Sequence, residues 1–197
     1  MIKTHWFGRW HPDELPARFE RLVQSWDTAN TASELADFSV CTSWGIRGPN
    51  LYLLDVLRRR MDYPELKRAV RAAHAQWRPD VVLIEDHASG TQLIQELVAE
   101  GLYAVTRYRP QGDKVMRLHA QTATIENGFV HLPQSAPWLA DYLYELANFP
   151  NGRFDDQVDA TAQFLDWQKG TGREDGIYAL YRQRFEELQR KQAAPPR

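Results

Sequence analysis

The sequence predicts an α/β domain in which helices pack on a mixed β-sheet, and two observations carry this prediction. Two apolar runs rich in β-branched and aromatic residues, at 38–46 and 51–57, flank the turn sequence Arg47-Gly-Pro-Asn. Such a pair of runs around a turn is typical of an antiparallel hairpin. After the hairpin, segments with helical periodicity alternate with short apolar runs, as they do when helices connect strands. The combination gives a sheet with both antiparallel and parallel strands.

Each element has its own signal in the chain. A short strand is expected over 22–26, ending at Asp27. Apolar residues three and four apart predict a helix that starts near Tyr63 and ends before Pro79. The continuous apolar run that begins at Val81 and ends at Glu85 is typical of a strand buried on both faces. The same criteria predict, in chain order, a helix at 90–100, a strand at 103–108, a helix at 113–126, an extended segment at 128–132, and helices at 138–147, 155–167 and 174–191.

Length and composition bound the class of protein. The chain has 197 residues, 43% of them hydrophobic and 25% charged, so we expect one folded domain at 21–170, with an irregular lead-in at 1–20 and a helical appendage and tail at 171–197. The formal net charge is −2, so any surface for nucleic acid would have to be local. Cys41 is the only cysteine, which excludes an intramolecular disulfide and a cysteine-rich zinc site.

Targeting and nucleotide-binding signals are not evident in the chain. No apolar run approaches the ~20 residues that span a bilayer, and the N-terminus lacks the apolar core of a secretory signal. The sequence contains no G-x-x-x-x-G-K-[ST] phosphate loop, so we do not expect it to hydrolyse ATP by itself. These observations predict a soluble protein with no membrane partner.

Acidic residues recur at the ends of predicted strands and at the start of a predicted helix. They are Asp27 after the first strand, Glu85 and Asp86 after the central strand, and Asp155, Asp156 and Asp159 at the start of the last core helix. Ligands gather at the carboxyl ends of strands in open sheets, and acids three apart share one helix face. Converging carboxylates repel one another, and a hard divalent cation relieves that repulsion. Carboxylate oxygens suit Mg²⁺ or Mn²⁺, and two such ions ~3.5–4 Å apart would clamp the attacking and leaving oxygens of a phosphodiester.

Each of these acids has a simpler interpretation when it is taken alone. An aspartate after a strand is more often a turn residue, and Asp155 or Asp156 could be the N-cap of the last helix. His87, two residues after Glu85, is more often a loop histidine than a metal ligand. The joint pattern, with acids at all three places in this order of elements, is what favours a metal site.

Two basic clusters could hold the phosphates of a nucleic acid, although a basic run is more often a solvated face. One consists of Arg58, Arg59 and Arg60 at the end of the hairpin. The other consists of Arg107, Arg109, Lys114 and Arg117, which follow the third sheet strand and enter the next helix. The second cluster is favoured because Lys114 and Arg117 share a helix face near the expected strand ends. The free backbone N–H groups at Gly90 and Thr91 could also hold a phosphate.

Four segments together resemble the nuclease domain of the large terminase subunit of tailed bacteriophages. They are Gln24-Ser-Trp-Asp27-Thr-Ala, Asp37-Phe-Ser-Val, Ile84-Glu-Asp-His-Ala-Ser-Gly90-Thr-Gln-Leu-Ile-Gln-Glu-Leu97 and Phe154-Asp-Asp-Gln-Val-Asp159-Ala. The resemblance covers about residues 20–168. It implies a ribonuclease H-like fold, with helices on both faces of the sheet, and an endodeoxyribonuclease that uses two metal ions to cleave concatemeric viral DNA during packaging.

The resemblance also assigns roles to individual residues. Asp27, Glu85 and Asp156 would be the catalytic metal ligands. Whether Asp155 and Asp159 bind metal as well is left open, because the family contains both a paired-acid pattern and a pattern of acids three apart. The residues that would be accessory to the site are Asp37, Asp86 and His87.

A full large terminase carries an ATPase motor before this domain, and this chain contains no phosphate loop. The chain is therefore expected to be an excised domain or a truncated gene of viral or prophage origin, with residues 1–20 as the remnant of an interdomain linker. The implied partners are double-stranded DNA, the ATPase domain, the small terminase subunit and the portal, in the cytoplasm of a bacterial host. The alternatives are a resolvase-like or repair nuclease of the same fold that cuts branched DNA, and a non-catalytic module that binds DNA or the portal.

Overall fold

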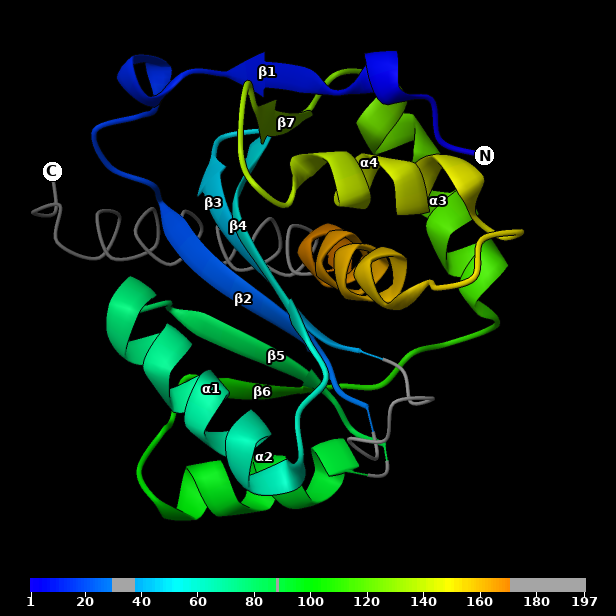
Figure 1. Ribbon diagram of the computed structural model, residues 1–197. Coiled ribbons are helices and arrows are strands. Elements are labelled where there is room, and N and C mark those ends of the chain that lie inside the picture. Colours follow the sequence, from blue (N-terminus) through cyan, green and yellow to red (C-terminus); the bar gives the residue numbers. More distant parts are fainter. Residues whose placement is uncertain (30–37, 88, 171–197) are drawn as a thin grey trace, which may run out of the picture.

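A seven-stranded mixed sheet forms the centre of the protein in the computed structural model, which describes residues 1–29, 38–87 and 89–170 (Figure 1). The strands lie in the order β1-β7-β4-β3-β2-β5-β6. Their bounds are β1 Gly8–Trp10, β2 Arg21–Asp27, β3 Ser39–Arg47, β4 Asn50–Arg59, β5 Val81–Glu85, β6 Val105–Tyr108 and β7 Val130–Pro133. β3 pairs antiparallel with both β2 and β4, and the other neighbours pair parallel. The predicted hairpin and the mixed sheet are confirmed.

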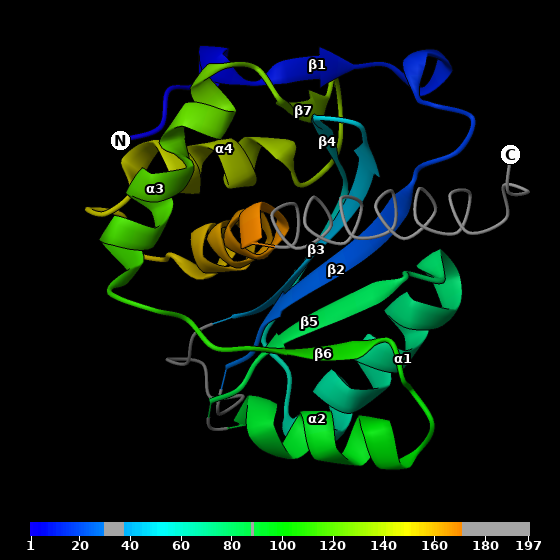
Figure 2. The ribbon, with the colours of Figure 1, turned by 180° about the vertical axis from the view of Figure 1, so that it is seen from behind.

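Helices cover both faces of the sheet, as expected (Figures 1 and 2). The bounds of the labelled helices are α1 Tyr63–Trp77, α2 Ser89–Ala99, α3 Lys114–Glu126 and α4 Leu139–Asn148, and a further helix, here called the C-terminal helix, covers 156–170. Two short 3-10 turns, Thr4–Trp6 and Pro12–Glu14, lie near the N-terminus. Helices α1 and α2 enclose one apolar cluster, and α3, α4 and the C-terminal helix enclose the other.

The two cores have different centres. Trp26 is fully buried on the side of α1 and α2. Trp44 is fully buried on the opposite side, where its ring stacks on Phe164 of the C-terminal helix with the centroids 4.4 Å apart. This contact fixes the C-terminal helix against the sheet, because aromatic rings of this size bury a large apolar area.

The ends of the helices follow local chemistry. Asp62 and Glu65 form a capping box at the start of α1, in which each side chain accepts a hydrogen bond from the other's backbone N–H. The helix ends at Arg78, whose backbone is left-handed (φ 47°), just before Pro79. Asp113 caps α3 by accepting a hydrogen bond of 2.9 Å from the backbone N–H of Met116.

The N-terminal segment differs from the expectation. Residues 1–20 do not form an irregular lead-in, because Gly8–Trp10 adds a parallel strand beside β7, and Ile2 and Phe7 are buried in the core. A three-residue strand is too short to show a period in the sequence. Strands β6 and β7 each begin two residues later than expected, and the expected helix at 174–191 lies outside the described residues. Within the described part of the chain, no helix is long and apolar enough to cross a membrane.

The sheet register brings two acidic strand ends together. Trp26 lies opposite Ile84 in the parallel pair of β2 and β5, so the next residues, Asp27 and Glu85, end neighbouring strands at the same edge. Asp27 is also opposite Val40 in the antiparallel pair of β2 and β3. The first turn of the C-terminal helix lies near this edge.

Candidate metal centre

The C-terminal helix is held over the ends of β2 and β5 by buried polar contacts. Gln163 donates its side-chain N–H groups to the hydroxyl of Ser25 at 3.0 Å and to the carbonyls of Trp26 and Leu83 at 3.3 and 3.4 Å. Ser25 in turn donates its hydroxyl to the carbonyl of Ala160 at 2.8 Å. These groups are buried, so each would lose free energy if it were left without a partner. The contacts fix the distance of the helix from the sheet and its rotation about its own axis.

A second set of buried polar contacts, made by a residue of α4, holds the first turn of the C-terminal helix. The buried carboxylate of Glu145 accepts hydrogen bonds from the backbone N–H of Gln157 at 2.6 Å and of Val158 at 3.4 Å. It also accepts one from the side-chain amide of Gln157 at 2.7 Å and forms an ion pair with Arg58 at 3.5 Å. A carboxylate at the N-terminus of a helix satisfies N–H groups that have no partner within the helix. Glu145 therefore positions Asp156, the residue at which the helix begins.

The carboxyl of Asp27 is buried among other acids of the site. The pKa of its carboxyl is raised well above the ordinary value, first by burial and then by the charges of Asp159, Asp156 and Glu85. Burial also raises the pKa of Asp159, against the opposing effect of Lys114. The four acids from two strands and one helix are therefore electrostatically coupled. Asp159 lies close enough to Asp27 to make the largest charge contribution to this shift, and whether it binds metal stays a prediction.

Two cations from the start of α3 enter this cluster. The ammonium of Lys114 lies 2.5 Å from a carboxylate oxygen of Asp155 and 3.1 Å from one of Asp159. Arg117 is 3.3 Å from the other oxygen of Asp159, and both side chains of that pair are only 14% exposed. Burial lowers the pKa of Lys114, but the hydrogen bonds and charges of Asp155 and Asp159 outweigh it, so the pKa is raised. Both cations were expected to contact DNA, and in the structure each is paired with an acid of the site.

The donor set fits a hard divalent cation. The groups that share the negative field of Asp27 are all carboxylates, and Lys114 already places one positive charge between Asp155 and Asp159. In the described residues, no three histidine, cysteine, aspartate or glutamate side chains stand close enough to hold a metal ion without moving. A cation bound beside Asp27 would lower the raised pKa of its carboxyl.

The carboxylate of Asp86, next to Glu85, is engaged by arginine and hydroxyl groups from neighbouring elements. Its carboxylate accepts hydrogen bonds from Arg109 at 2.9 Å, from Arg107 at 3.2 Å and from the hydroxyl of Thr91 at 3.1 Å. Arg109 makes the largest contribution to the lowered pKa of Asp86. Asp86 thus links β6 to the start of α2, and the two arginines that were expected to bind DNA form ion pairs with it.

The turn between β5 and α2 explains part of the segment that carried the family resemblance. A Cβ on Gly90 would lie 2.1 Å from the carbonyl oxygen of Glu85, so only glycine allows α2 to start this close to the strand. Ser89 lies within 3.3 Å of the hydroxyl of Thr28 and donates to the carbonyl of Ala29 at 3.3 Å. These contacts connect the turn to the residues that follow Asp27.

The remaining predicted site residues have varied positions. Asp155 precedes the C-terminal helix, is 39% exposed on its side chain and contacts Lys114. His87 is exposed on the turn after Glu85, and its backbone N–H donates to the carbonyl of that residue. Asp37 lies outside the described residues.

Sequence reasoning missed Glu145, Gln163 and Ser25. Gln163 carried a signal, since it lies four residues after Asp159 and seven after Asp156 and so continues the polar face that these acids begin. Glu145 carried none, because its partners lie on another helix.

A family model described as the terminase RNaseH-like domain matches residues 24–166. The chain belongs to this family. The matched range of the terminase RNaseH-like domain contains every candidate carboxylate named above, from Asp27 to Asp159. No curated protein matches the chain.

Solved structures of phage terminases share the fold. The large terminase nuclease of thermophilic phage G20c with bound magnesium is 16% identical, with a TM-score of 0.60 over 77% of this chain and 82% of that chain. The g2p nuclease domain of bacteriophage SPP1 with bound manganese is 14% identical, with a TM-score of 0.58 over 85% of this chain and 99% of that chain. The large terminase of another thermophilic bacteriophage is 12% identical, with a TM-score of 0.58, and the aligned region is 77% of this chain and 41% of that one. This chain thus spans less than half of that large terminase, and the ribonuclease H-like fold is confirmed.

Proposed function

We propose that this chain is a metal-dependent DNA endonuclease that cleaves concatemeric viral DNA during genome packaging. The observation that carries the proposal is the convergence of Asp27, Glu85, Asp156 and Asp159 at one edge of the sheet, in a chain of the terminase RNaseH-like family. Relatives of this fold hold magnesium in the G20c structure and manganese in the SPP1 structure. A carboxylate set of this kind suits either ion.

The chain's own residues would have three roles: metal ligands on the strands, metal ligands on the C-terminal helix, and cations that attract a phosphate. Asp27 and Glu85 offer oxygen ligands from the rigid ends of β2 and β5, and Asp156 and Asp159 offer them from the C-terminal helix. Asp155 is the more exposed neighbour and is the candidate that contributes least. When bound, a pair of divalent ions supplies charge stabilisation to the attacking and leaving oxygens of a phosphodiester. Lys114 and Arg117 place positive charge beside the same point, where a phosphate would approach.

The partners follow from the family rather than from contacts in this structure. Double-stranded DNA is the proposed substrate. A terminase ATPase domain, a small terminase subunit and a portal are the proposed partners, in the cytoplasm of a bacterial host infected by a phage or carrying a prophage. The same chemistry acting on branched DNA would make the chain a resolvase-like nuclease, which substrate choice distinguishes.

The proposal is tested by incubating the purified chain with supercoiled plasmid and with a four-way junction in Mn²⁺, Mg²⁺ or EDTA. We expect nicking and linearisation of the plasmid in either metal and no cleavage in EDTA. The cleavage rate should fall more than about a hundredfold in Asp27→Asn and in Asp159→Asn, which is the order of effect expected for essential ligands and their partners.

Asp80→Asn is the matched control. Asp80 lies at the opposite end of the same two strands, where its carboxylate accepts a hydrogen bond of 2.7 Å from the backbone N–H of Leu22. An asparagine keeps an oxygen for that bond, so this variant should cut as the unaltered chain does. A folded chain that cuts neither substrate in any metal contradicts the nuclease proposal. Cleavage of the junction in preference to the plasmid contradicts the packaging role.

A further inference from the structure

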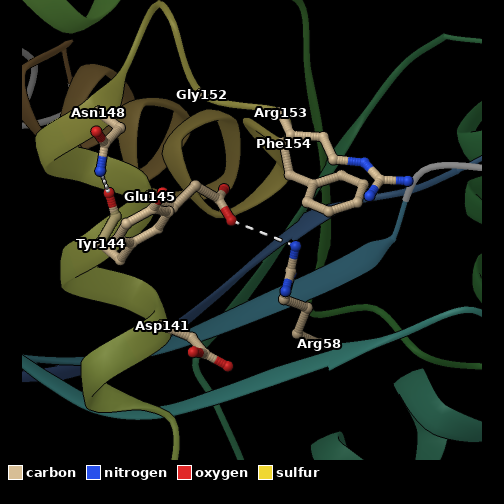
Figure 3. A pocket seen from close by; sticks show the side chains of 8 residues that line it. All are labelled: Arg58, Asp141, Tyr144, Glu145, Asn148, Gly152, Arg153 and Phe154. Atoms are coloured by element: carbon tan, nitrogen blue, oxygen red, sulfur yellow. Dashed lines mark hydrogen bonds and ion pairs between the residues drawn. The ribbon is translucent and has the colours of Figure 1, made fainter.

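Three arginines stack on two phenylalanine rings next to the carboxylate site. We call Arg58, Arg60, Arg153, Phe38 and Phe154 the arginine–phenylalanine cluster. The rings of Phe38 and Phe154 meet edge to face with their centroids 5.2 Å apart. The guanidinium of Arg58 lies 3.8 Å from the centroid of Phe38 and 5.0 Å from that of Phe154. Arg60 lies 4.0 Å from the centroid of Phe38. Arg153 lies 5.0 Å from the centroid of Phe154 (Figure 3).

The sheet register fixes the distance from this cluster to the proposed site of cleavage. Asp27 is opposite Val40 on β3, and Val40 is opposite Arg58 on β4. Directly opposed residues point to the same face, and neighbouring strands are ~4.8 Å apart, so Arg58 lies roughly 10 Å from Asp27 on the same face. Phe154 also precedes Asp156 by only two residues. The cluster therefore lies close enough to the site for one DNA strand to contact both.

The arginines of the cluster each contact a phenylalanine ring, in addition to any charged group with which they pair. Arg107, Arg109, Lys114 and Arg117 are each paired with Asp86, Asp155 or Asp159. Arg58 is paired with Glu145, which also caps the C-terminal helix, so that acid's oxygens are already engaged. Arg153 is exposed and lies against a ring. A guanidinium stacked on a ring keeps its N–H groups in its own plane, where they can form paired hydrogen bonds to a phosphate.

A pocket of about 160 Å³ opens beside the cluster (Figure 3). Arg58, Arg153 and Phe154 form one wall, and Tyr144 of α4, 72% exposed, forms part of the other. Asp141 is the remaining acid that lines it. Guanidinium groups that line a pocket are suited to a sugar–phosphate backbone, because they donate paired, charge-assisted hydrogen bonds to a phosphate.

We propose that the arginine–phenylalanine cluster binds the phosphate backbone of the DNA strand close to the scissile bond. This inference rests on the proposed function. The ligand class is a phosphodiester of duplex DNA, held without base readout. The cluster, rather than Arg107 and Arg109, would then set the register of the strand at the metal site.

The test measures binding of a fluorescein-labelled 30-base-pair duplex by the full chain in EDTA, by anisotropy, across a series of salt concentrations. Arg60→Gln with Arg153→Gln is the variant, because Arg58 is tied to Glu145 and its loss could disturb folding. Two lost phosphate contacts should weaken binding and reduce the slope of log K against log salt by about 1.8, at ~0.9 per phosphate. Arg60→Lys with Arg153→Lys should keep the slope, since the charge remains.

Arg47→Gln is the matched control, because Arg47 ends the same hairpin at its opposite end and is 57% exposed. Its slope should equal that of the unaltered chain. Equal losses in Arg47→Gln and in the double variant, or an unchanged slope in the double variant, overturn the inference. Metal-dependent plasmid cleavage by the unaltered chain is measured in parallel. If the unaltered chain cleaves the plasmid and the double variant binds the duplex normally, the inference fails and the proposed function stands. If the unaltered chain does not cleave the plasmid, the proposed function fails.

Discussion

Replacing Glu145 should destabilise the protein and weaken metal binding at a site to which Glu145 contributes no ligand. Its carboxylate accepts two short hydrogen bonds from Gln157, at 2.6 and 2.7 Å, and a long one from Val158 at 3.4 Å. A hydrogen bond to a charged group contributes about 1.5–3 kcal/mol, and breaking a buried charged contact on one side costs about 3–5 kcal/mol. Glu145→Ala should therefore lower the free energy of unfolding by about 3–5 kcal/mol.

That loss corresponds to a fall in melting temperature of roughly 6–20 °C, at about 2–4 °C per kcal/mol for a chain of this length. Glu145→Gln keeps one oxygen for the backbone N–H of Gln157 but turns an N–H₂ toward that residue's side-chain amide. It should lose about half as much, roughly 1.5–3 kcal/mol, the contribution of one charged hydrogen bond. The measurement is thermal and urea unfolding in EDTA.

Mn²⁺ affinity, titrated by calorimetry well below the melting temperature, separates positioning from stability. Because Glu145 fixes the turn that carries Asp156, its removal should weaken Mn²⁺ binding about ten- to a hundredfold, as loss of a residue that orients a metal ligand does. Asp141→Asn, one turn earlier on α4 and lining the same pocket, should change stability by less than about 1 kcal/mol. Unfolding of Glu145→Ala within about 1 kcal/mol of the unaltered chain would refute the reasoning.

Three further predictions concern the site itself. Asp27→Asn removes a carboxylate whose pKa is raised by burial and by neighbouring charge, so it should stabilise the chain in EDTA by on the order of 1 kcal/mol at pH 7.5 and abolish stabilisation by Mn²⁺. A carboxyl whose folded-state pKa is raised destabilises the fold fully above that pKa, and this penalty shrinks as pH falls and vanishes below the ordinary pKa. The stability gap between Asp27→Asn and the unaltered chain should therefore narrow as pH falls from 7.5 toward 5, and a gap that widens contradicts the prediction. Lys114→Gln should bind Mn²⁺ about tenfold more tightly, or about 1.4 kcal/mol, in calorimetry, since no ammonium has to leave the carboxylates; weaker binding would show that Lys114 supports the ion instead. Gly90→Ala should lose about 1–3 kcal/mol in urea unfolding, because its methyl group would meet the carbonyl of Glu85, and an unchanged midpoint would refute that contact.

Local signals predicted most of the fold. The hairpin followed from a two-residue turn between apolar runs, and β5 followed from a run of four apolar residues that ends at Glu85. Strand β1 was missed because three residues carry no period and its partner, β7, lies more than a hundred residues away. Acids at the ends of strands could be recognised because strand ends are visible in the sequence.

The pairings of charged groups could not be predicted in the same way. The sequence left open whether Asp155 or Asp156 caps the C-terminal helix, and in the structure the backbone N–H groups of Gln157 and Val158 are held by Glu145 from α4. Lys114 was expected to face DNA, and it lies among the carboxylates. Such pairs depend on how separate elements pack, which no local pattern contains.

The contacts that hold the C-terminal helix to the sheet have a consequence for synthesis of the protein. The bond from Ser25 to Ala160 spans 135 residues, and the bond from Gln163 to Ser25 spans 138. A nascent chain can therefore form the hairpin and the strands around Asp27 and Glu85 long before the helix with Asp156 and Asp159 leaves the ribosome. Long-range contacts of this kind form late in folding. If the site cuts DNA as proposed, every translation product that stops before this helix would lack two of the four acids and should be unable to cut the host's own DNA.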